Sequence, residues 1–300
     1  MHEPTSPLNT LWQICLLISL ASTAYPQTAS KCDPPPIART TTQAELGNQL
    51  SHSGCWEQAA QAYFQALQAD PANLSALNNL GHALTKLGRL AEAARTFEQA
   101  VKQQPDNPIL HYNLGNVYLQ LHQVDAAVVQ LSEAVQLKAD YAEAHSDLGN
   151  ALAQKGVNDK AIASLNRALA INPALFAAEN NLGAIHYSLK NYREAVRHFD
   201  RAVMLAPDSF PINYNLGTAR LSLHRYSLAV ESLQRALQLA PDDAGAHYNL
   251  GLAFLGVKDR TASLQQYSIL NNLNPSLAAK LYQAVHINQV VVIGPKKQTN

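Results

Sequence analysis

Histidine is the residue type whose number first suggests chemistry in this sequence. The chain has 11 histidines, and His111, His145 and His247 stand at equivalent positions of a pattern that recurs at a fixed interval. Zinc ligands must lie about 2 Å from one metal centre, whereas neighbouring packed helices are about 8–10 Å apart. Equivalent positions of successive repeats are therefore too far apart to share an ion. We expect these histidines to pack between helices, and we expect no metal site and no cofactor.

Catalytic motifs are missing from the sequence. It contains no Gly-x-Ser-x-Gly, no His-Glu-x-x-His, no glycine-rich phosphate loop and no Cys-x-x-Cys pair. The chain is also neutral, with 22 Lys and Arg against 22 Asp and Glu, so no overall field attracts nucleic acid or an acidic membrane surface. The sequence therefore predicts a protein that is not an enzyme, has no catalytic residues and binds neither nucleic acid nor a specific small molecule.

Two cysteines are placed so that a disulfide bond between them is feasible. Cys32 lies in a proline-rich leading segment, and Cys55 lies in the turn after an expected helix over residues 40–53. Such a helix is about 21 Å long, and the eight residue steps from Cys32 to Thr40 reach about 26 Å when extended. The leading segment can therefore run back along the helix and bring Cys32 to Cys55. The alternative is two unrelated thiols in a reducing compartment.

The elements that position these residues come from a sequence repeat that is marked by a Leu-Gly pair. One repeat carries Gly81, Ala93, Phe97, Ala100 and Pro105. The other repeats mostly have the same residue types in these columns, with leucine or tyrosine for Phe97 in some and Ala139 for proline in one. This spacing predicts two antiparallel helices per repeat that pack closely through the small residues, with proline ending each repeat. The glycines of the Leu-Gly pairs are Gly47, Gly81, Gly115, Gly149, Gly183, Gly217 and Gly251.

These columns resemble the tetratricopeptide-repeat family, whose helix–turn–helix unit has a length of about 34 residues and this Leu-Gly, Ala, Phe, Ala, Pro pattern. The resemblance implies an all-α fold, a right-handed superhelical solenoid of helix–turn–helix repeats with a C-terminal capping helix. It covers residues 40–277. The seven units are residues 40–73, 74–107, 108–141, 142–175, 176–209, 210–243 and 244–277.

The N-terminal end of the chain carries a separate signal. Leu11–Ala21 is an apolar run followed by a site with small residues, so residues 1–24 predict a signal peptide that is cleaved before Tyr25. The alternatives are a membrane anchor formed by residues 11–24 and a helix packed on the array. Residues 25–39 form the proline-rich leading segment. We expect export to a bacterial periplasm or envelope, with attachment to the inner membrane or a cytoplasmic location as alternatives.

The C-terminal end adds a helix and a tail. A capping helix is expected to begin near residue 276, and residues 278–289 form the rest of it. Residues 290–300 hold an apolar run of β-forming residues, Val290–Ile293, and a polar tail. The run is expected either to fold back onto the array or to pair with a partner strand.

In the family that the sequence resembles, the first helices of successive repeats line a concave groove. The resemblance assigns to it the residues three and two before each repeat glycine and one after it. An asparagine amide can hydrogen-bond to an extended peptide backbone, although these asparagines could instead fix the contacts between helices. Tyrosine suits interfaces, and we expect Tyr214 and Tyr248 to contact a partner. The expected groove residues are Asn78, Asn79, Tyr112, Asn113, Asn116, Asn150, Asn180, Asn181, Tyr187, Tyr214, Asn215, Tyr248, Asn249 and Leu252.

Two functions fit these features. The leading hypothesis is a non-enzymatic scaffold that holds extended, weakly charged segments of a protein or peptide partner in its groove, in envelope assembly or secretion. The alternative is an accessory subunit of a complex that modifies a polysaccharide or glycan, which would have a stable stoichiometric partner. In either case the array ends leave room for self-association.

Overall fold

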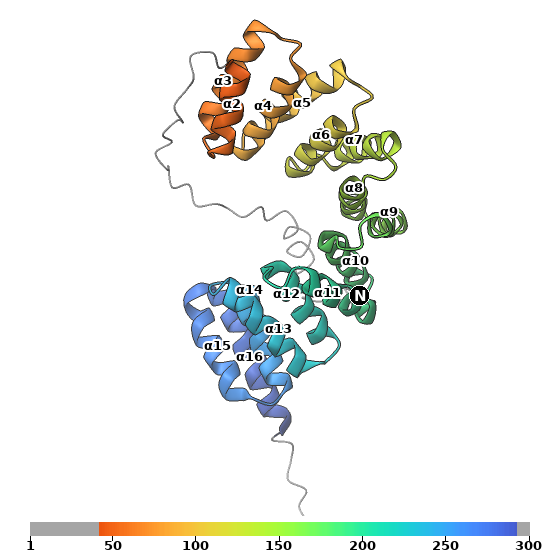
Figure 1. The fold of residues 1–300 in the computed structure, drawn as a ribbon. Coiled ribbons are helices and arrows are strands. Elements are labelled where there is room, and N and C mark those ends of the chain that lie inside the picture. The colour runs from red at the N-terminus through yellow and green to blue at the C-terminus, as the bar shows by residue number, and fades with distance from the viewer. Residues whose placement is uncertain (1–41, 293–300) are drawn as a thin grey trace, which may run out of the picture. The chain divides into compact units, whose positions relative to one another are not determined.

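The computed structural model describes residues 42–292. They belong to two compact units, residues 42–173 and residues 174–292, which we call the N-terminal unit (α2–α9) and the C-terminal unit (α10–α16) (Figure 1). The helices of this range number fifteen, no strand is present in it, and the expected all-α repeat solenoid is confirmed. Cys32, the apolar run Leu11–Ala21 with its cleavage site, and Ile293 lie outside the described residues.

Each repeat contributes a first and a second helix. The first helices are α2 (Gln43–His52), α4 (Leu74–Lys86), α6 (Pro108–Gln120), α8 (Ala142–Gln154), α10 (Phe176–Ser188), α12 (Phe210–Ser222) and α14 (Ala244–Gly256). The second helices are α3 (Trp56–Ala69), α5 (Leu90–Gln103), α7 (Val124–Leu137), α9 (Asn158–Ile171), α11 (Tyr192–Leu205), α13 (Tyr226–Leu239) and α15 (Arg260–Leu273). The last helix is α16 (Pro275–Val292).

Polar residues at the repeat junctions start several of the first helices. The side chains of Asn73, Asn107 and Asp243 accept hydrogen bonds of 2.9, 3.1 and 2.7 Å from backbone amides in the first turns of α4, α6 and α14. Such N-caps satisfy amides that have no partner within the helix. These caps fix where each repeat begins.

The turn between the two helices of each repeat requires a left-handed backbone at one position. Glycine supplies it in three repeats, for example Gly88 at φ 72°. In the other four repeats the residue is larger, and φ is still positive: His122, Lys190, His224 and Lys258 have φ of 58°, 61°, 57° and 66°. Only glycine adopts this conformation without a steric penalty, so these four turns are strained relative to the glycine turns.

The two helices of a repeat approach closely at the glycine of the Leu-Gly pair. A Cβ atom built on Gly81 would lie 2.5 Å from the ring of Phe97, and one built on Gly115 would lie 2.7 Å from Leu131 Cγ. The aromatic or leucine side chain of the second helix therefore occupies the space that the glycine leaves, as the spacing predicts. The last repeat differs, because Gly251 faces Leu281 of α16.

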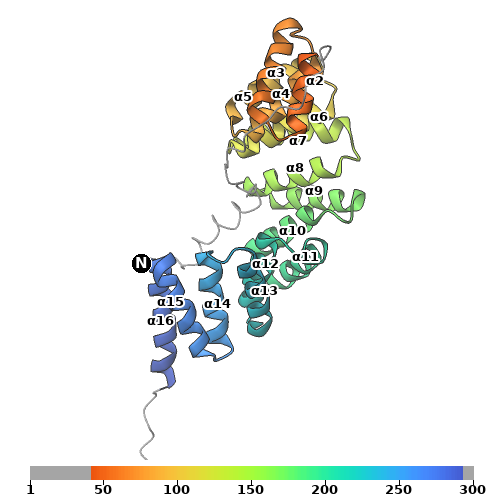
Figure 2. The same cartoon turned by 60° about the vertical axis from the view of Figure 1, so that its left-hand side comes forward.

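The capping helix α16 packs on both helices of the last repeat, and α14, α15 and α16 lie side by side (Figure 2). Leu281 and Val285 are buried between them. The helix runs on to Val292, so the expectation that Val290–Val292 leave the helix as a β-type run is wrong. Extending an existing helix adds one hydrogen bond per residue, whereas a strand needs a neighbouring strand.

Candidate partner-binding surface

The first helices of neighbouring repeats contact one another directly within each unit: α2 contacts α4 and α6 contacts α8 in the N-terminal unit, and α12 contacts both α10 and α14 in the C-terminal unit. We call the side chains three and two positions before each repeat glycine, and one after it, the first-helix face. These columns hold all the expected groove residues except Tyr187, which lies one turn after its repeat glycine.

Asparagines in these columns join neighbouring repeats by hydrogen bonds. In four repeats, an asparagine two before the repeat glycine donates to residues three before or one after the glycine of the preceding repeat. Each such contact is called a rung here. The rungs with asparagine donors are Asn79 to Asn48 (2.9 Å), Asn113 to Asn78 (2.9 Å) and to His82 (3.1 Å), Asn215 to Asn180 (3.1 Å), and Asn249 to Thr218 (3.0 Å) and Tyr214 (3.3 Å).

For the buried asparagines, the rungs favour the role of fixing the contacts between helices. Four of the expected contact residues, Asn113, Asn180, Asn215 and Asn249, are buried and hydrogen-bonded to the neighbouring repeat. Asn150 is buried as well. The expectation that these five side chains contact a partner is therefore wrong, because the folded array covers them. Their position in the repeat was correct, but the sequence pattern does not show which side chains the next repeat covers.

Tyr214 is also part of the core. Its side chain is 2% exposed and packs with Ala229, Leu233 and Leu250. The prediction that Tyr214 forms a binding surface is therefore wrong, because its ring fills the space between α12, α13 and α14. Tyr248 at the equivalent position of the next repeat is half-buried.

Eight of the expected groove residues keep part of their surface accessible. In the N-terminal unit they are Asn78, Asn79, Tyr112 and Asn116, and in the C-terminal unit they are Asn181, Tyr187, Tyr248 and Leu252. Tyr187 also shares a hydrogen bond of 3.1 Å with Ser222. Whether these eight residues contact a partner stays a prediction.

One rung runs in the opposite direction and was not predicted from the sequence. Asp147 of α8 stands where the other repeats after the first have asparagine, and it accepts hydrogen bonds from Tyr112 and Asn116 of α6. The pKa of Asp147 is raised to about 6, chiefly by burial and also by the Glu143 carboxylate one turn earlier, against the lowering effect of the two hydrogen bonds. The signal was visible as a lone carboxylate in a column of amides in the middle repeats.

The histidine column has the packing role that the sequence predicts. The side chain four before the repeat glycine forms a hydrogen bond with the backbone carbonyl six residues earlier, in the turn between this repeat and the preceding one. The contacts of Nε2 are His111 to Pro105 O (2.7 Å), His145 to Ala139 O (3.2 Å) and His247 to Pro241 O (2.8 Å). Asn213 makes the same contact with Pro207 O at 2.9 Å. These side chains therefore pin the turns between repeats.

Two further features concern possible chemistry. Cys55 is disulfide-bonded. The other two cysteines of the chain, Cys15 and Cys32, lie outside the described residues. The pairing of Cys32 with Cys55 therefore stays a prediction. Within residues 42–292, no group of three His, Cys, Asp or Glu side chains could hold a metal ion, and no helix is both long and apolar enough to span a bilayer.

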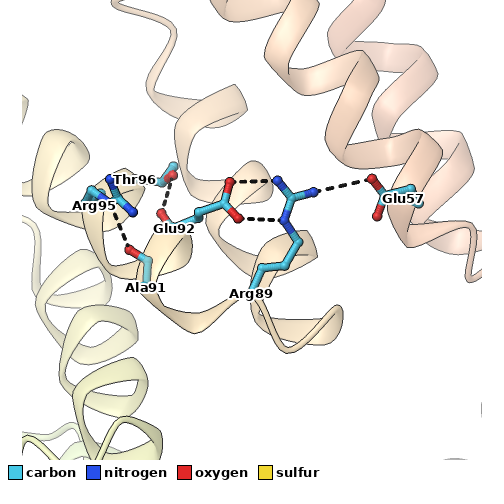
Figure 3. A network of polar contacts seen from close by, with 6 residues as sticks. All are labelled: Glu57, Arg89, Ala91, Glu92, Arg95 and Thr96. Carbon is cyan, nitrogen blue, oxygen red and sulfur yellow. Dashed lines mark hydrogen bonds and ion pairs between the residues drawn. The ribbon is translucent and has the colours of Figure 1, made fainter.

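Away from the first-helix face, a hollow lies between the second helices α3 and α5, with α4 at its floor. It has a volume of about 700 Å³ and an apolar lining that includes Phe64, Leu77 and Leu84. At its rim Arg89 forms two hydrogen bonds with Glu92, at 2.6 and 2.8 Å, and an ion pair with Glu57 at 3.3 Å (Figure 3). One guanidinium thus lies between two carboxylates at this rim, and Arg95, which also lines the hollow, adds a second positive charge.

Several solved structures have folds similar to that of this chain. MamA is 27% identical over 53% of this chain and 93% of its own length, with a TM-score of 0.50. The pilF protein of Pseudomonas aeruginosa is 19% identical over 72% of this chain and 98% of its own, with a TM-score of 0.64. The Cut9–Hcn1 hetero-tetramer of the APC/C is 19% identical over 83% of this chain and 49% of its own, with a TM-score of 0.67. The last two similarities show the fold alone.

Family models match most of the repeat region. The model described as "TPR repeat" matches residues 47–88, 81–122, 115–156, 149–190 and 219–257, and the model described as "Tetratricopeptide repeat" matches residues 176–209. No curated protein matches the chain. The family matches, the constant spacing of the Leu-Gly pairs and the helix pairs agree, and the chain belongs to the tetratricopeptide-repeat family.

Proposed function

We propose that this chain is a non-enzymatic scaffold that binds extended, weakly charged segments of a protein partner along the first-helix face of each unit. One observation carries the proposal. The three columns of this face contain no Asp, Glu, Lys or Arg except Glu45 and Asp147, while amide and tyrosine side chains such as Asn116, Asn181 and Tyr248 remain partly accessible. Such side chains can hydrogen-bond to a peptide backbone whatever its sequence.

The rungs support this proposal through the rigidity that they give the face. Buried, paired amides between neighbouring first helices hold the accessible side chains in fixed positions before a ligand arrives. A surface that is ordered in advance loses less conformational freedom on binding. Tetratricopeptide repeats generally mediate protein or peptide binding, which agrees with this use of the face.

For the location of the protein we propose export, with a role in envelope assembly or secretion. Two observations support it: the disulfide bond of Cys55, since disulfides persist mainly in oxidising compartments, and the apolar run Leu11–Ala21 in the sequence.

Site-specific photo-cross-linking in the cell that makes the protein tests the proposal. The photoreactive residue replaces Asn116 or Tyr248, one on the first-helix face of each unit. Matched controls carry it at Val129 of α7 or Met204 of α11, which are 62% and 83% exposed on second helices. We expect adducts with a protein partner from Asn116, Tyr248 or both, and none of the same partner from the controls.

Two outcomes would contradict the proposal. Equal yields of the same adduct from the first-helix and second-helix positions would show that the first-helix face has no special role. Adducts from Val129 and Met204 alone would move the binding surface to the second helices. Fractionation of the same cells gives the compartment independently of the partner.

A further inference from the structure

The rung at Asp147 differs from the asparagine rungs in its chemistry. At the other described rungs an amide NH₂ group donates to the preceding repeat, as Asn113 donates to Asn78 at 2.9 Å. An ionised carboxylate has no hydrogen to donate. The donors are instead Tyr112 and Asn116. The N-terminal unit thus has a negatively charged group in a face that is otherwise almost free of charge.

The surroundings of Asp147 leave this charge without a cation. Burial disfavours the ionised form, and the titratable groups that bear on it are Tyr112 of α6 and Glu143 of its own helix, which are not cationic. A carboxylate can accept about four hydrogen bonds, and Tyr112 and Asn116 supply two. Asp147, Tyr112 and Asn116 are nevertheless only partly buried as residues, so this group of side chains is not sealed off from the first-helix face.

Aromatic rings beside the carboxylate favour a cation as well. The ring centroids of Tyr112 and Tyr141 are 4.9 Å apart, and both rings are partly exposed. The Lys138 ammonium already lies 4.9 Å from the centroid of Tyr141, within the range of a cation–π contact. Glu143 is exposed one turn before Asp147. Tyr112, Asn116, Tyr141, Glu143 and Asp147 are called the Asp147 site from here on.

We propose that the Asp147 site takes the side chain of a lysine or arginine from the extended segment that the N-terminal unit binds. The inference rests on the proposed function and adds to it the chemistry of one ligand residue. An ammonium or guanidinium group supplies the donors and the positive charge that Asp147 lacks, and its alkyl stem covers the tyrosine rings. A neutral or acidic side chain does neither.

The chain itself provides the variant that tests this site without disturbing the fold. In Asp147→Asn the rung regains the asparagine of the other repeats, and Asn249 shows that such an asparagine can donate to a tyrosine in the Tyr112 position, since it lies 3.3 Å from the Tyr214 hydroxyl. The matched control is Asp159→Asn, which removes one exposed carboxylate from the second helix α9 of the same unit.

The experiment measures binding of the full chain to immobilised undecapeptides. The peptides have blocked ends, a background of Ser, Thr and Ala, and a central lysine, norleucine or glutamate; a photoreactive group near the centre locates the contact. We expect the lysine peptide to bind at least about tenfold more tightly than the norleucine peptide at pH 7.5. This preference is lost in Asp147→Asn and kept in Asp159→Asn. Cross-links map to the first-helix face of the N-terminal unit.

A second readout needs no peptide. The carbon-13 shift of the Asp147 carboxyl group is followed against pH with and without N-acetyl-lysine methylamide. A bound cation favours the ionised form, so the amine must shift the midpoint to lower pH, and an uncharged norleucine analogue must leave it in place. An unchanged midpoint at high amine concentration would overturn the inference.

The outcomes separate the inference from the proposed function. Equal binding of the three peptides, with cross-links on the first-helix face, overturns the cation site and leaves the proposed function standing. A lysine preference that survives in Asp147→Asn also overturns the site. Cross-links that map only outside the first-helix face overturn both the proposed function and the inference that rests on it.

Discussion

The side-chain amide of Asn215 donates a hydrogen bond of 3.1 Å to the side-chain oxygen of Asn180 in the preceding repeat, and both residues are buried. Replacing either residue by alanine leaves a buried polar group without this partner, which costs about 1–3 kcal/mol. We expect Asn180→Ala and Asn215→Ala each to lower the free energy of unfolding by that amount. The measurement is urea unfolding followed by circular dichroism.

The double variant shows whether the two amides act together. If the hydrogen bond carries the effect, the loss in Asn180→Ala/Asn215→Ala falls short of the sum of the single losses by about 1 kcal/mol. Strictly additive losses would mean that the two amides stabilise the array independently.

Replacing Tyr214 by alanine should affect the fold. The ring is 2% exposed in the core of the C-terminal unit, and truncating such a ring costs about 3–5 kcal/mol. Tyr214→Phe keeps the ring and removes only a hydroxyl whose contact with Asn249 is 3.3 Å long, so it should lose about 1 kcal/mol or less. Thermal melts of the two variants check this, and a Tyr214→Ala variant that melts like the parent would contradict the burial.

The sequence predicts the contacts that the repeat imposes and misses those that depend on neighbouring repeats. The close approach of Gly81 to Phe97 follows from the spacing, because both residues belong to one helix pair. The burial of Tyr214 depends on contacts with the next repeat and the pairing of Asn215 on contacts with the preceding one, which the repeat period does not encode. Val290–Val292 illustrate a third limit, since β propensity yields to an existing helix.

The four turns with a positive φ at a larger residue offer a route to a more stable array. Lys190 and Lys258 are exposed and have φ of 61° and 66°. For a non-glycine residue this conformation costs about 1–2 kcal/mol. Glycine avoids that cost but loses more backbone entropy on folding, so the net gain from the substitution is smaller. We expect Lys190→Gly and Lys258→Gly each to raise the free energy of unfolding by about 0.5–1 kcal/mol.

The reverse change is the control for this prediction. Gly156 occupies the same position in its repeat with φ 76°, and a Cβ atom there would meet no neighbouring atom. Gly156→Ala should therefore destabilise through the backbone conformation alone, by about 1 kcal/mol. A neutral Gly156→Ala together with neutral lysine variants would show that these turns carry no strain.

Asp147 should make stability depend on pH between its ordinary pKa of 3.8 and its folded pKa of about 6. The folded chain binds more protons than the unfolded chain in this window, so the contribution of Asp147 to stability is greatest below pH 3.8 and falls as pH rises to 6. We expect Asp147→Asn to be more stable than the parent at pH 7, by at most about 3 kcal/mol, and equally stable near pH 3.5. Urea unfolding at several pH values measures this difference, and a difference independent of pH would contradict it.

The disulfide bond of Cys55 should stabilise the first repeat. If its partner is Cys32, the closed loop has about 24 residues, and the bond contributes about 3 kcal/mol in the chain-entropy description. We expect reduction to lower the melting temperature, and Cys32→Ser to have the same effect while Cys15→Ser has none. Non-reducing peptide mapping identifies the partner directly, and a peptide that joins Cys15 to Cys55 would refute the pairing with Cys32.

The reversed rung at Asp147 also bears on how a ligand finds its place. Rungs of similar chemistry recur from one repeat to the next. An extended ligand that contacted only amides would therefore bind with nearly the same free energy after a shift by one repeat. The Asp147 carboxylate makes one rung of the N-terminal unit different from its neighbours, because Asp147 accepts where its counterparts Asn79 and Asn113 donate. One charged group of the ligand would then be enough to fix the register of the bound segment. The amides on either side would bind its backbone whatever its sequence.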